Sequence, residues 1–387
     1  MIYLDNAATT NVLPEVLDAM LPYFTENYGN PSALYSLGID AKHAIERARE
    51  QIAEVINADP DEIYFTSGGT EADNWAVSLF GIGSSVAYSA IEHHAIANSA
   101  NELMHREWIG NCDPLDVDKN GIIDIKSIDW DYYLCGNEEG IISVMTANNE
   151  IGTIQPVKEV AKIAKKYNSL FHTDAVQAFC QIPIDVKDMG VDLLSASGHK
   201  IHAPKGVGFL YIRRGLDVPP LIYGGGQERG MRSGTENVPA IVGFGVAAEY
   251  MHRTMKKRAE YMTALRDYMI DRLTTEIPYC YLNGSREHRL PNNVNVSFKY
   301  VEGEALVLGL SNHGICCSAG SACTSGSLEP SHVLKAIGLP DDLAHGALRL
   351  TLSEQNTREE IDYTINVIKQ IVQQLRELNP TYWRECK

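Results

Sequence analysis

Apolar residues along the chain form short continuous runs and longer stretches with helical spacing. The short runs have the length of buried strands and lie at 63–66, 86–89, 141–146, 191–194, 206–212, 293–298 and 347–352, with a further run ending at Asp174. The longer stretches repeat apolar residues three and four positions apart, as amphipathic helices do, and lie at 40–57, 156–167, 238–270, 303–311 and beyond Thr357. A helix is also expected over 19–28. Strands alternating with helices favour an α/β fold.

Polar residues follow two of these strands. Asp174 and Gln177 end one apolar run, and the sequence Ser-Gly-His-Lys at 197–200 follows the next. Both runs read as buried parallel strands, so both polar groups are expected at the carboxyl edge of one sheet, where ligands of open α/β folds bind. Pyridoxal phosphate needs a lysine for its imine and a carboxylate at its pyridine nitrogen. Taken singly, Lys200 could be a surface residue and Asp174 a turn residue; together they predict this cofactor.

A glycine turn at 67–70 precedes a helix that is expected to begin at Glu71 or just before it. Glycines let the main chain approach an anion, and free N–H groups at a helix N-terminus favour negative charge. Such turns are common, but upstream of an imine lysine this one predicts a phosphate site with Gly69 and Thr70. The stretch at 232–235 could bind phosphate or be a flexible loop.

Two further positions carry candidate chemistry. His93 and His94 follow the strand 86–89, and either could lie over a cofactor ring or be a hydrogen-bonded loop residue. Arg349 lies inside an apolar run, where an arginine rarely occurs unpaired. A substrate carboxylate or an internal salt bridge would satisfy its charge.

Small residues surround Cys323 in the loop at about 314–330. This composition favours a mobile, partly exposed loop, and a reactive thiol there needs a base or a positive charge nearby. Cys316 and Cys317 adjoin an apolar residue and are expected to be buried and inert. The spacing lacks the paired cysteines of zinc modules, so no metal site is predicted.

Length and charge narrow the class of protein. A chain of 387 residues is expected to form two domains, over 12–256 and over 1–11 with 257–387. The formal net charge of −17 argues against nucleic acid or an anionic membrane as partner. The sequence begins without a signal peptide, so the eight cysteines are expected to be reduced thiols in a cytoplasmic protein.

Long ordered motifs run along nearly the whole chain, among them YLDNAATT, FTSGGTEADN, NNEIGTIQPV, HTDAVQ, SGHKIHAPKGVG, GGGQERGMRSGTEN and SAGSACTSGSLEPSHVLKAIGL. In these motifs the sequence resembles the group I cysteine desulfurases of the NifS/IscS type. The resemblance implies a fold-type I, aspartate aminotransferase-like transferase that depends on pyridoxal phosphate. It also implies a large mixed-sheet α/β domain and a small α+β domain in a homodimer.

The resemblance also implies a role for each matching residue. Lys200 would carry the imine and act as base, Asp174 would hold the pyridine nitrogen, and Gln177 would contact the ring hydroxyl. His93 would stack on the ring, which resolves the choice between the two histidines. The phosphate ligands would be Gly69, Thr70, Ser197 and His199, with Thr235 from the partner subunit, and Gly198 would be a further cofactor-binding residue. Asn149 and Arg349 would bind the substrate, with Asn149 also beside the cofactor, and Cys323 would be the nucleophile and a transient iron–sulfur ligand.

The implied reaction converts L-cysteine to L-alanine and leaves a persulfide on Cys323, from which sulfur passes to an acceptor or scaffold protein for iron–sulfur cluster or thio-cofactor synthesis. A selenocysteine lyase or another fold-type I enzyme is the nearest alternative, and a non-catalytic metal or iron–sulfur carrier is a more distant one. The chain departs from the family at Ser353-Glu354, at the Cys316-Cys317 pair, and in stopping at Lys387 before the tail with which some members dock a scaffold.

Overall fold

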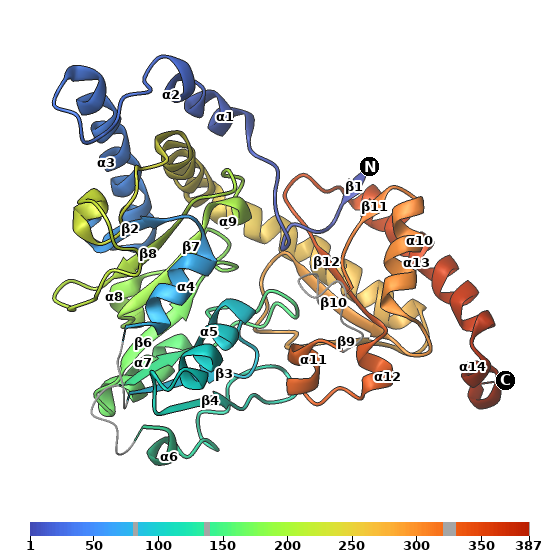
Figure 1. Ribbon diagram of the computed structural model, residues 1–387. Coiled ribbons are helices and arrows are strands. Elements are labelled where there is room, and N and C mark those ends of the chain that lie inside the picture. Colours follow the sequence, from blue (N-terminus) through green and yellow to red (C-terminus); the bar gives the residue numbers. More distant parts are fainter. Residues whose placement is uncertain (80–83, 135–139, 320–329, 387) are drawn as a thin grey trace.

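The computed structural model describes residues 1–79, 84–134, 140–319 and 330–386. In these ranges, seven strands form the main sheet in the order β2-β8-β7-β6-β5-β3-β4 (Figure 1). Their bounds are Ile63–Thr66 (β2), Ser85–Ser89 (β3), Asn111–Leu115 (β4), Gly140–Ser143 (β5), Leu170–Asp174 (β6), Leu193–Ser197 (β7) and Gly208–Ile212 (β8). Strands β7, β6, β5, β3 and β4 are parallel, and β8 runs antiparallel to both β7 and β2. The predicted parallel pairing of the strands before Gln177 and Lys200 is confirmed.

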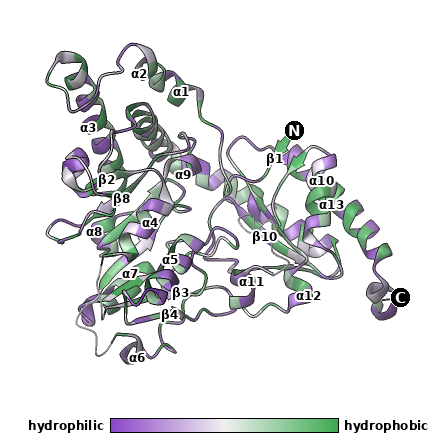
Figure 2. Cartoon of the chain, viewed as in Figure 1, coloured by the Kyte–Doolittle hydropathy of each residue, from purple (hydrophilic) through white to green (hydrophobic). Residues whose placement is uncertain are grey.

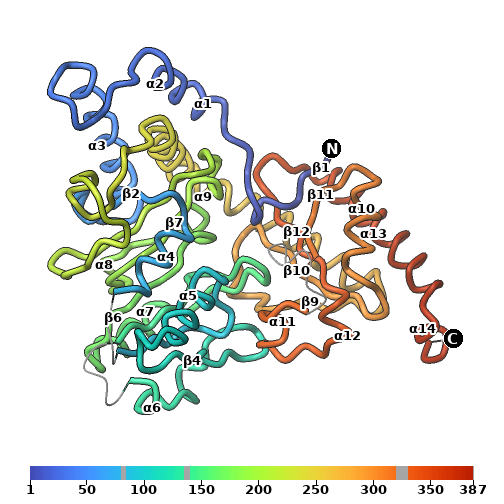
Figure 3. The backbone as a smooth tube through the Cα atoms, in the orientation of Figure 1, coloured from blue at the N-terminus to red at the C-terminus, as the bar shows by residue number. Residues whose placement is uncertain are grey.

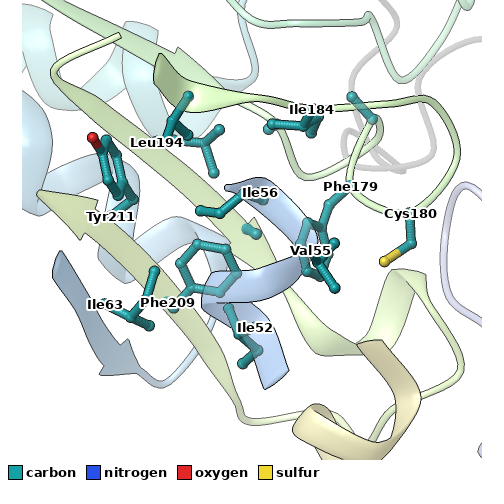
Figure 4. Packing of buried hydrophobic residues seen from close by; sticks show 14 of the residues in the cluster. Ile52, Val55, Ile56, Ile63, Phe179, Cys180, Ile184, Leu194, Phe209 and Tyr211 are labelled. Atoms are coloured by element: carbon teal, nitrogen blue, oxygen red, sulfur yellow. The ribbon is translucent and has the colours of Figure 1, made fainter. Parts of the chain in front are cut away.

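Helices cover both faces of this sheet. One core lies against α3 (Ser36–Ile56), α7 (Val157–Lys166) and the first half of α9 (Val238–Glu276), and Figure 4 shows part of it around Phe209 and Ile52. The other core lies against α4 (Gly69–Val77) and α5 (His94–His105). All residues of β3, β5, β7 and β8 are buried, which explains why their sequences read as continuous apolar runs.

The predicted helix over 19–28 is wrong in its limits. The structure has α1 (Pro14–Met20) and α2 (Pro22–Thr25), and each begins at a proline, which suits the first helical position because its missing N–H needs no partner there. Helix α3 begins four residues before the predicted position 40, and Asn57 ends it in the left-handed conformation. Strand β5 ends at Ser143, three residues before the predicted end at 146.

A smaller unit follows along α9, whose second half packs into a separate core. In the described part of this unit an antiparallel sheet has the order β12-β10-β9, and Val296 of its middle strand pairs with both Leu282 and Leu348. Its strands are β9 (Cys280–Leu282), β10 (Asn293–Phe298) and β12 (Ala347–Thr351). Helices α10 (Gly303–Asn312) and α13 (Arg358–Leu378) cover it, and hydrophobic and hydrophilic residues alternate along α13 (Figure 2). A capping box of Thr357 and Glu360 begins α13, the helix expected beyond Thr357.

The N-terminal segment of the chain pairs with this smaller unit. Strand β1 (Ile2–Tyr3) pairs in parallel with β11 (Ile315–Cys316), and Figure 3 follows the chain from there to α1 beside the main sheet. The remaining helices are α6 (Trp130–Leu134), α8 (Val186–Met189), α11 (His332–Ala336), α12 (Asp341–Ala344) and α14 (Pro380–Cys386). The predicted domain limits, 12–256 and 1–11 with 257–387, stay a prediction. Within the described ranges, no helix is long and apolar enough to cross a membrane.

Candidate active site

Lys200 and Gln177 meet at the carboxyl edge of the main sheet. Lys200 ends a short 3₁₀ turn after β7, and its Nζ donates to the carbonyl oxygens of Ala7 (2.6 Å) and Ala8 (2.8 Å). The Gln177 amide donates to the same Ala7 oxygen at 3.1 Å. The N-terminal segment is therefore part of the site, which the sequence analysis did not predict for residues 7 and 8.

Asp174 ends β6 beside β7 and is fully enclosed. Its Oδ1 accepts from the main-chain N–H of Val176 at 2.8 Å. Burial raises the pKa of this carboxyl to about 6, although the N–H of Val176 and the charge of Lys200 both act in the opposite direction. A buried carboxylate of this kind is stabilised by a cationic partner, and a protonated pyridine nitrogen is one.

Two more buried acids surround Asp174, and the sequence analysis missed both. Asp73 lies on α4 and Glu92 follows β3, and each is about 1% exposed. Burial, together with the negative charge of Asp174, raises the pKa of both carboxyls well above their usual values. Asp73 Oδ1 and Glu92 Oε2 have no hydrogen-bond partner among the described residues. Both acids therefore hold a proton more tightly than exposed carboxyls do.

His172 links this acidic group to the sheet. Its Nδ1 lies 2.8 Å from the Ser143 hydroxyl, its Nε2 lies 2.9 Å from the Ser195 hydroxyl, and Asp73 Oδ1 is 3.8 Å away. Burial lowers the pKa of His172 to about 3, so the ring is neutral. The spacing could have revealed it, because residues two apart on a strand point to the same face, and His172 precedes Asp174 by two.

A cleft at the N-terminus of α4 has the donors of a phosphate site. It is lined by main chain and side chains of Thr9, Ser67, Gly68, Gly69, Thr70, Ser197, His199, Lys205 and their neighbours. A Cβ at Gly69 would lie 2.6 Å from the Val176 side chain, so a larger residue would require Val176 or the turn to move. His199 Nδ1 lies 3.2 Å from the Thr9 hydroxyl, and burial lowers the pKa of this histidine to about 4. N–H groups, hydroxyls and one ammonium suit a dianion.

The two histidines after β3 have different surroundings. His93 caps α5, and its Nδ1 accepts from the N–H of Ala95 at 3.1 Å, which places the ring proton on Nε2. Burial and then the charge of Lys200 lower the pKa of His93 to about 4, so this ring is neutral and close to the lysine. His94 instead packs against His332, with ring centres 4.6 Å apart.

Arg349 makes the internal salt bridge that the sequence left open. Its Nη2 lies 2.9 Å from the Asp5 carboxylate, and its Nη1 donates to the carbonyl of Asn149 at 3.1 Å. Its Nε is buried without a hydrogen-bond partner in the described part of the chain. An incoming carboxylate would satisfy that group.

Four residues singled out in the sequence lie apart from this group or outside the described residues. Thr235 is exposed and lines a depression with Ser67 and Gly206, which also line the phosphate cleft. Cys323 lies outside the described residues. The expectation that Cys316 and Cys317 are buried is wrong, since both are half-buried beside the short β1–β11 pair, although desolvation does raise the pKa of the Cys317 thiol to about 12.

The described residues fit pyridoxal phosphate. The cleft at the N-terminus of α4 has anion donors and a closely packed glycine, Asp174 offers a buried carboxylate at the end of β6, and Lys200 follows the neighbouring strand β7. No cluster of metal-ligating side chains occurs in the described ranges.

Comparison with known proteins identifies the class. The model of the aminotransferase class-V family matches residues 2–364, so the chain belongs to that family. It is 49% identical to cysteine desulfurase IscS of Methanosarcina thermophila, across 100% of this chain and 95% of the relative, and 48% identical to cysteine desulfurase IscS of Dictyoglomus turgidum, across 100% and 98%.

Solved structures agree with this assignment. A NifS-like protein superposes with a TM-score of 0.88 at 37% identity, covering 96% of this chain and 99% of the other. SspA in complex with cysteine superposes with a TM-score of 0.80 at 34% identity, covering 92% and 100%. The predicted family, the fold-type I architecture and the pyridoxal phosphate cofactor are confirmed.

Proposed function

We propose that this protein is a pyridoxal phosphate-dependent cysteine desulfurase that converts L-cysteine to L-alanine and holds the released sulfur as a persulfide on Cys323. One observation carries the proposal. Lys200, the Asp174 carboxylate and a phosphate cleft meet at one edge of the sheet, and the buried Arg349 reaches the same edge through Asn149.

Each described residue has a place in binding the cofactor. Lys200 would link the cofactor, Asp174 would hold its pyridine nitrogen, and Gln177 would contact its ring hydroxyl. Gly69, Thr70, Ser197 and His199 would bind its phosphate, and Gly198 would be a further cofactor-binding residue. When bound, the cofactor supplies an electron-withdrawing ring that acidifies the substrate α-carbon and weakens the bond from the β-carbon to sulfur.

The substrate carboxylate is bound by Arg349. Its Nε is the unpaired donor, while Asp5 and the Asn149 carbonyl hold the other two nitrogens in place. The Asn149 side chain completes the contact. A guanidinium held in this way presents its charge with little loss of side-chain entropy on binding.

Protons are moved by Lys200 and held by His93. Lys200 takes the proton from the substrate α-carbon as general base. His93 is neutral and carries its proton on Nε2, so it can lie against the cofactor and donate a hydrogen bond without adding positive charge.

Sulfur leaves through Cys323. Its thiolate attacks the substrate sulfur, an S–S bond forms, and the bond between that sulfur and the substrate β-carbon breaks. The electron pair of the broken bond remains with the substrate, which gains protons and leaves as alanine. The persulfide is then passed to an acceptor protein for iron–sulfur or thio-cofactor synthesis, and in this role Cys323 is a transient ligand of a nascent cluster.

A homodimer is part of the proposal, with Thr235 reaching the partner's phosphate. A large apolar side chain is exposed near this position, since Tyr28 is 67% exposed. Tyr28 and Thr235 line the same depression. A cytoplasmic location is proposed as well, and it agrees with the six free thiols in the described part of the chain.

The test uses the purified protein loaded with pyridoxal phosphate and given L-cysteine. Alanine should appear, and mass spectrometry should find one added sulfur on the peptide that contains Cys323. C323A should keep the bound cofactor and lose persulfide formation. Absence of alanine from the loaded wild type would overturn the proposal, and a clear preference for selenocysteine would favour the lyase.

A further inference from the structure

Three elements of the smaller unit form hydrogen bonds to the loop after β5, residues 148–152. Arg349 of β12 donates to the carbonyl of Asn149, and Asn293 and Asn295 of β10 both donate to the carbonyl of Glu150 at 2.9 Å. The fit is close, because a Cβ at Gly152 would lie 2.5 Å from the Asn293 side chain. The position of this loop therefore depends on the smaller unit.

The third element, α11, contacts this loop through a hydrogen bond between two buried side chains. The Ser331 hydroxyl donates to Oε2 of Glu150 at 2.5 Å, and the two residues are 6% and 4% exposed. The same hydroxyl caps α11 by accepting from the N–H groups of Val333 (3.1 Å) and Leu334 (3.4 Å). One proton and both acceptor positions of Ser331 are thus in use, and only an acceptor at Glu150 satisfies its proton.

His332, the next residue, joins the same turn to the loop after β3. Its Nε2 lies 2.9 Å from the carbonyl of Glu92, and because a carbonyl only accepts, the ring proton is on Nε2. The ring also packs on His94, the neighbour of His93. The Ser331–His332 turn therefore contacts the ends of both β3 and β5.

These contacts lie at one end of the segment that carries Cys323 in the sequence. At the other end, Ser318 exchanges two main-chain hydrogen bonds with Arg349, at 2.7 and 3.1 Å. Both described ends are thus bonded to residues of the candidate site, Ser318 to Arg349 itself and Ser331 to the neighbour of Asn149.

We propose that Glu150 is a positioning residue for sulfur transfer, because its carboxylate holds the Ser331–His332 turn in register with the substrate contact at Asn149. The inference rests on the proposed function. Glu150 touches neither cofactor nor substrate and acts through Ser331. Its loss is expected to slow the capture of sulfur by Cys323 while leaving cofactor binding and the response of the cofactor to cysteine unchanged.

The test compares E150A with E150Q in the loaded, full-length protein. A single turnover with L-cysteine gives two rates, the absorbance change of the bound cofactor and the appearance of persulfide on Cys323 by mass spectrometry. In E150A the persulfide rate should fall about 10- to 100-fold, as expected for a misplaced reacting group, with the absorbance change near the wild-type rate. E150Q should retain most of the persulfide rate, since its amide oxygen can accept from Ser331.

A second pair of variants separates this contact from helix capping. S331A loses the contact and the cap of α11, whereas T357A loses the cap of α13, which lies in the same unit. Only S331A should reproduce the E150A defect, and only E150A and S331A should show faster hydrogen exchange over residues 330–337.

The outcomes separate the two claims. An unchanged persulfide rate in both E150A and S331A would overturn the inference while the function stands. Equal loss of the absorbance change and of the persulfide would also overturn it, since Glu150 would then act on the cofactor or the substrate. A wild-type protein that forms no persulfide would instead refute the proposed function.

Discussion

The Lys200 ammonium donates to the carbonyl of Ala7 at 2.6 Å, although the two residues are 193 positions apart. This contact places the N-terminal segment next to the Lys200 side chain. The same segment supplies Asp5, which holds Arg349. Residues 5–8 therefore contact both Lys200, the proposed cofactor lysine, and Arg349, the proposed substrate arginine, so the first residues of the chain are part of the candidate site.

Replacing Asp174 tests the partner of the pyridine nitrogen. D174N keeps the shape of the side chain and removes its charge, so turnover should fall about 100-fold, the usual cost of one catalytic electrostatic contact. Alanine formation with loaded enzyme measures it. D73N is the matched control, because burial and the charge of Asp174 raise the pKa of Asp73 and so favour its uncharged form. Equal losses in the two variants would contradict the assignment of charge.

Arg349 tests the carboxylate contact. R349K keeps the positive charge but loses the planar set of guanidinium N–H donors. The kcat/KM for L-cysteine should therefore fall about 10- to 100-fold, which corresponds to the free energy of one or two hydrogen bonds to a charged group. Steady-state kinetics measure the change, which should be seen mainly in KM. R286K, at an exposed position, serves as the control. Wild-type kinetics in R349K would remove Arg349 from the substrate site.

Gly69 tests the phosphate cleft. In G69A the new Cβ would lie 2.6 Å from the Val176 side chain, so the first turn of α4 or Val176 must move. The affinity for pyridoxal phosphate should fall about 10-fold or more, measured by titrating the apoprotein, since hydrogen bonds to the charged phosphate are lost. In G226A the Cβ meets open space at a φ of −85°, and affinity should not change. Wild-type affinity in G69A would place the phosphate elsewhere.

Glu150 makes stability depend on pH. Burial raises the pKa of its carboxyl from 4.5 to about 7, against the opposing effects of the Ser331 hydrogen bond and the Arg349 charge. The folded state therefore binds this proton more tightly than the unfolded state, and the contribution is present at low pH and lost as pH rises from 4.5 through 7. Between pH 5 and 8 the wild type should lose about 2 to 3 kcal/mol more unfolding free energy than E150Q, measured by urea titration. Parallel curves for the two proteins would contradict the raised pKa.

Much of the fold could be predicted from sequence because buried parallel strands are apolar throughout. The runs before Asp174 and Lys200 gave the strand positions, and the parallel rule then placed both polar groups at one edge. Helix limits were less predictable where prolines divide an apolar stretch, as at Pro14 and Pro22.

The missed residues have a common physical reason. Asp73 and Glu92 look like ordinary surface acids in the sequence, and only the packing of α4 and the loop after β3 shows that they are buried around Asp174. The Ser331–Glu150 contact joins residues 181 positions apart. No spacing rule reveals such a pair, because it depends on how the two units pack together.

The most direct test of the account follows the sulfur atom. L-cysteine labelled with ³⁴S is given to the loaded wild type, C323A and K200A, and intact protein, peptides and alanine are analysed together. The account predicts labelled sulfur on the Cys323 peptide and alanine in the wild type, bound cofactor without persulfide in C323A, and neither product in K200A. Labelled sulfur on another cysteine, or alanine from K200A at the wild-type rate, would contradict it.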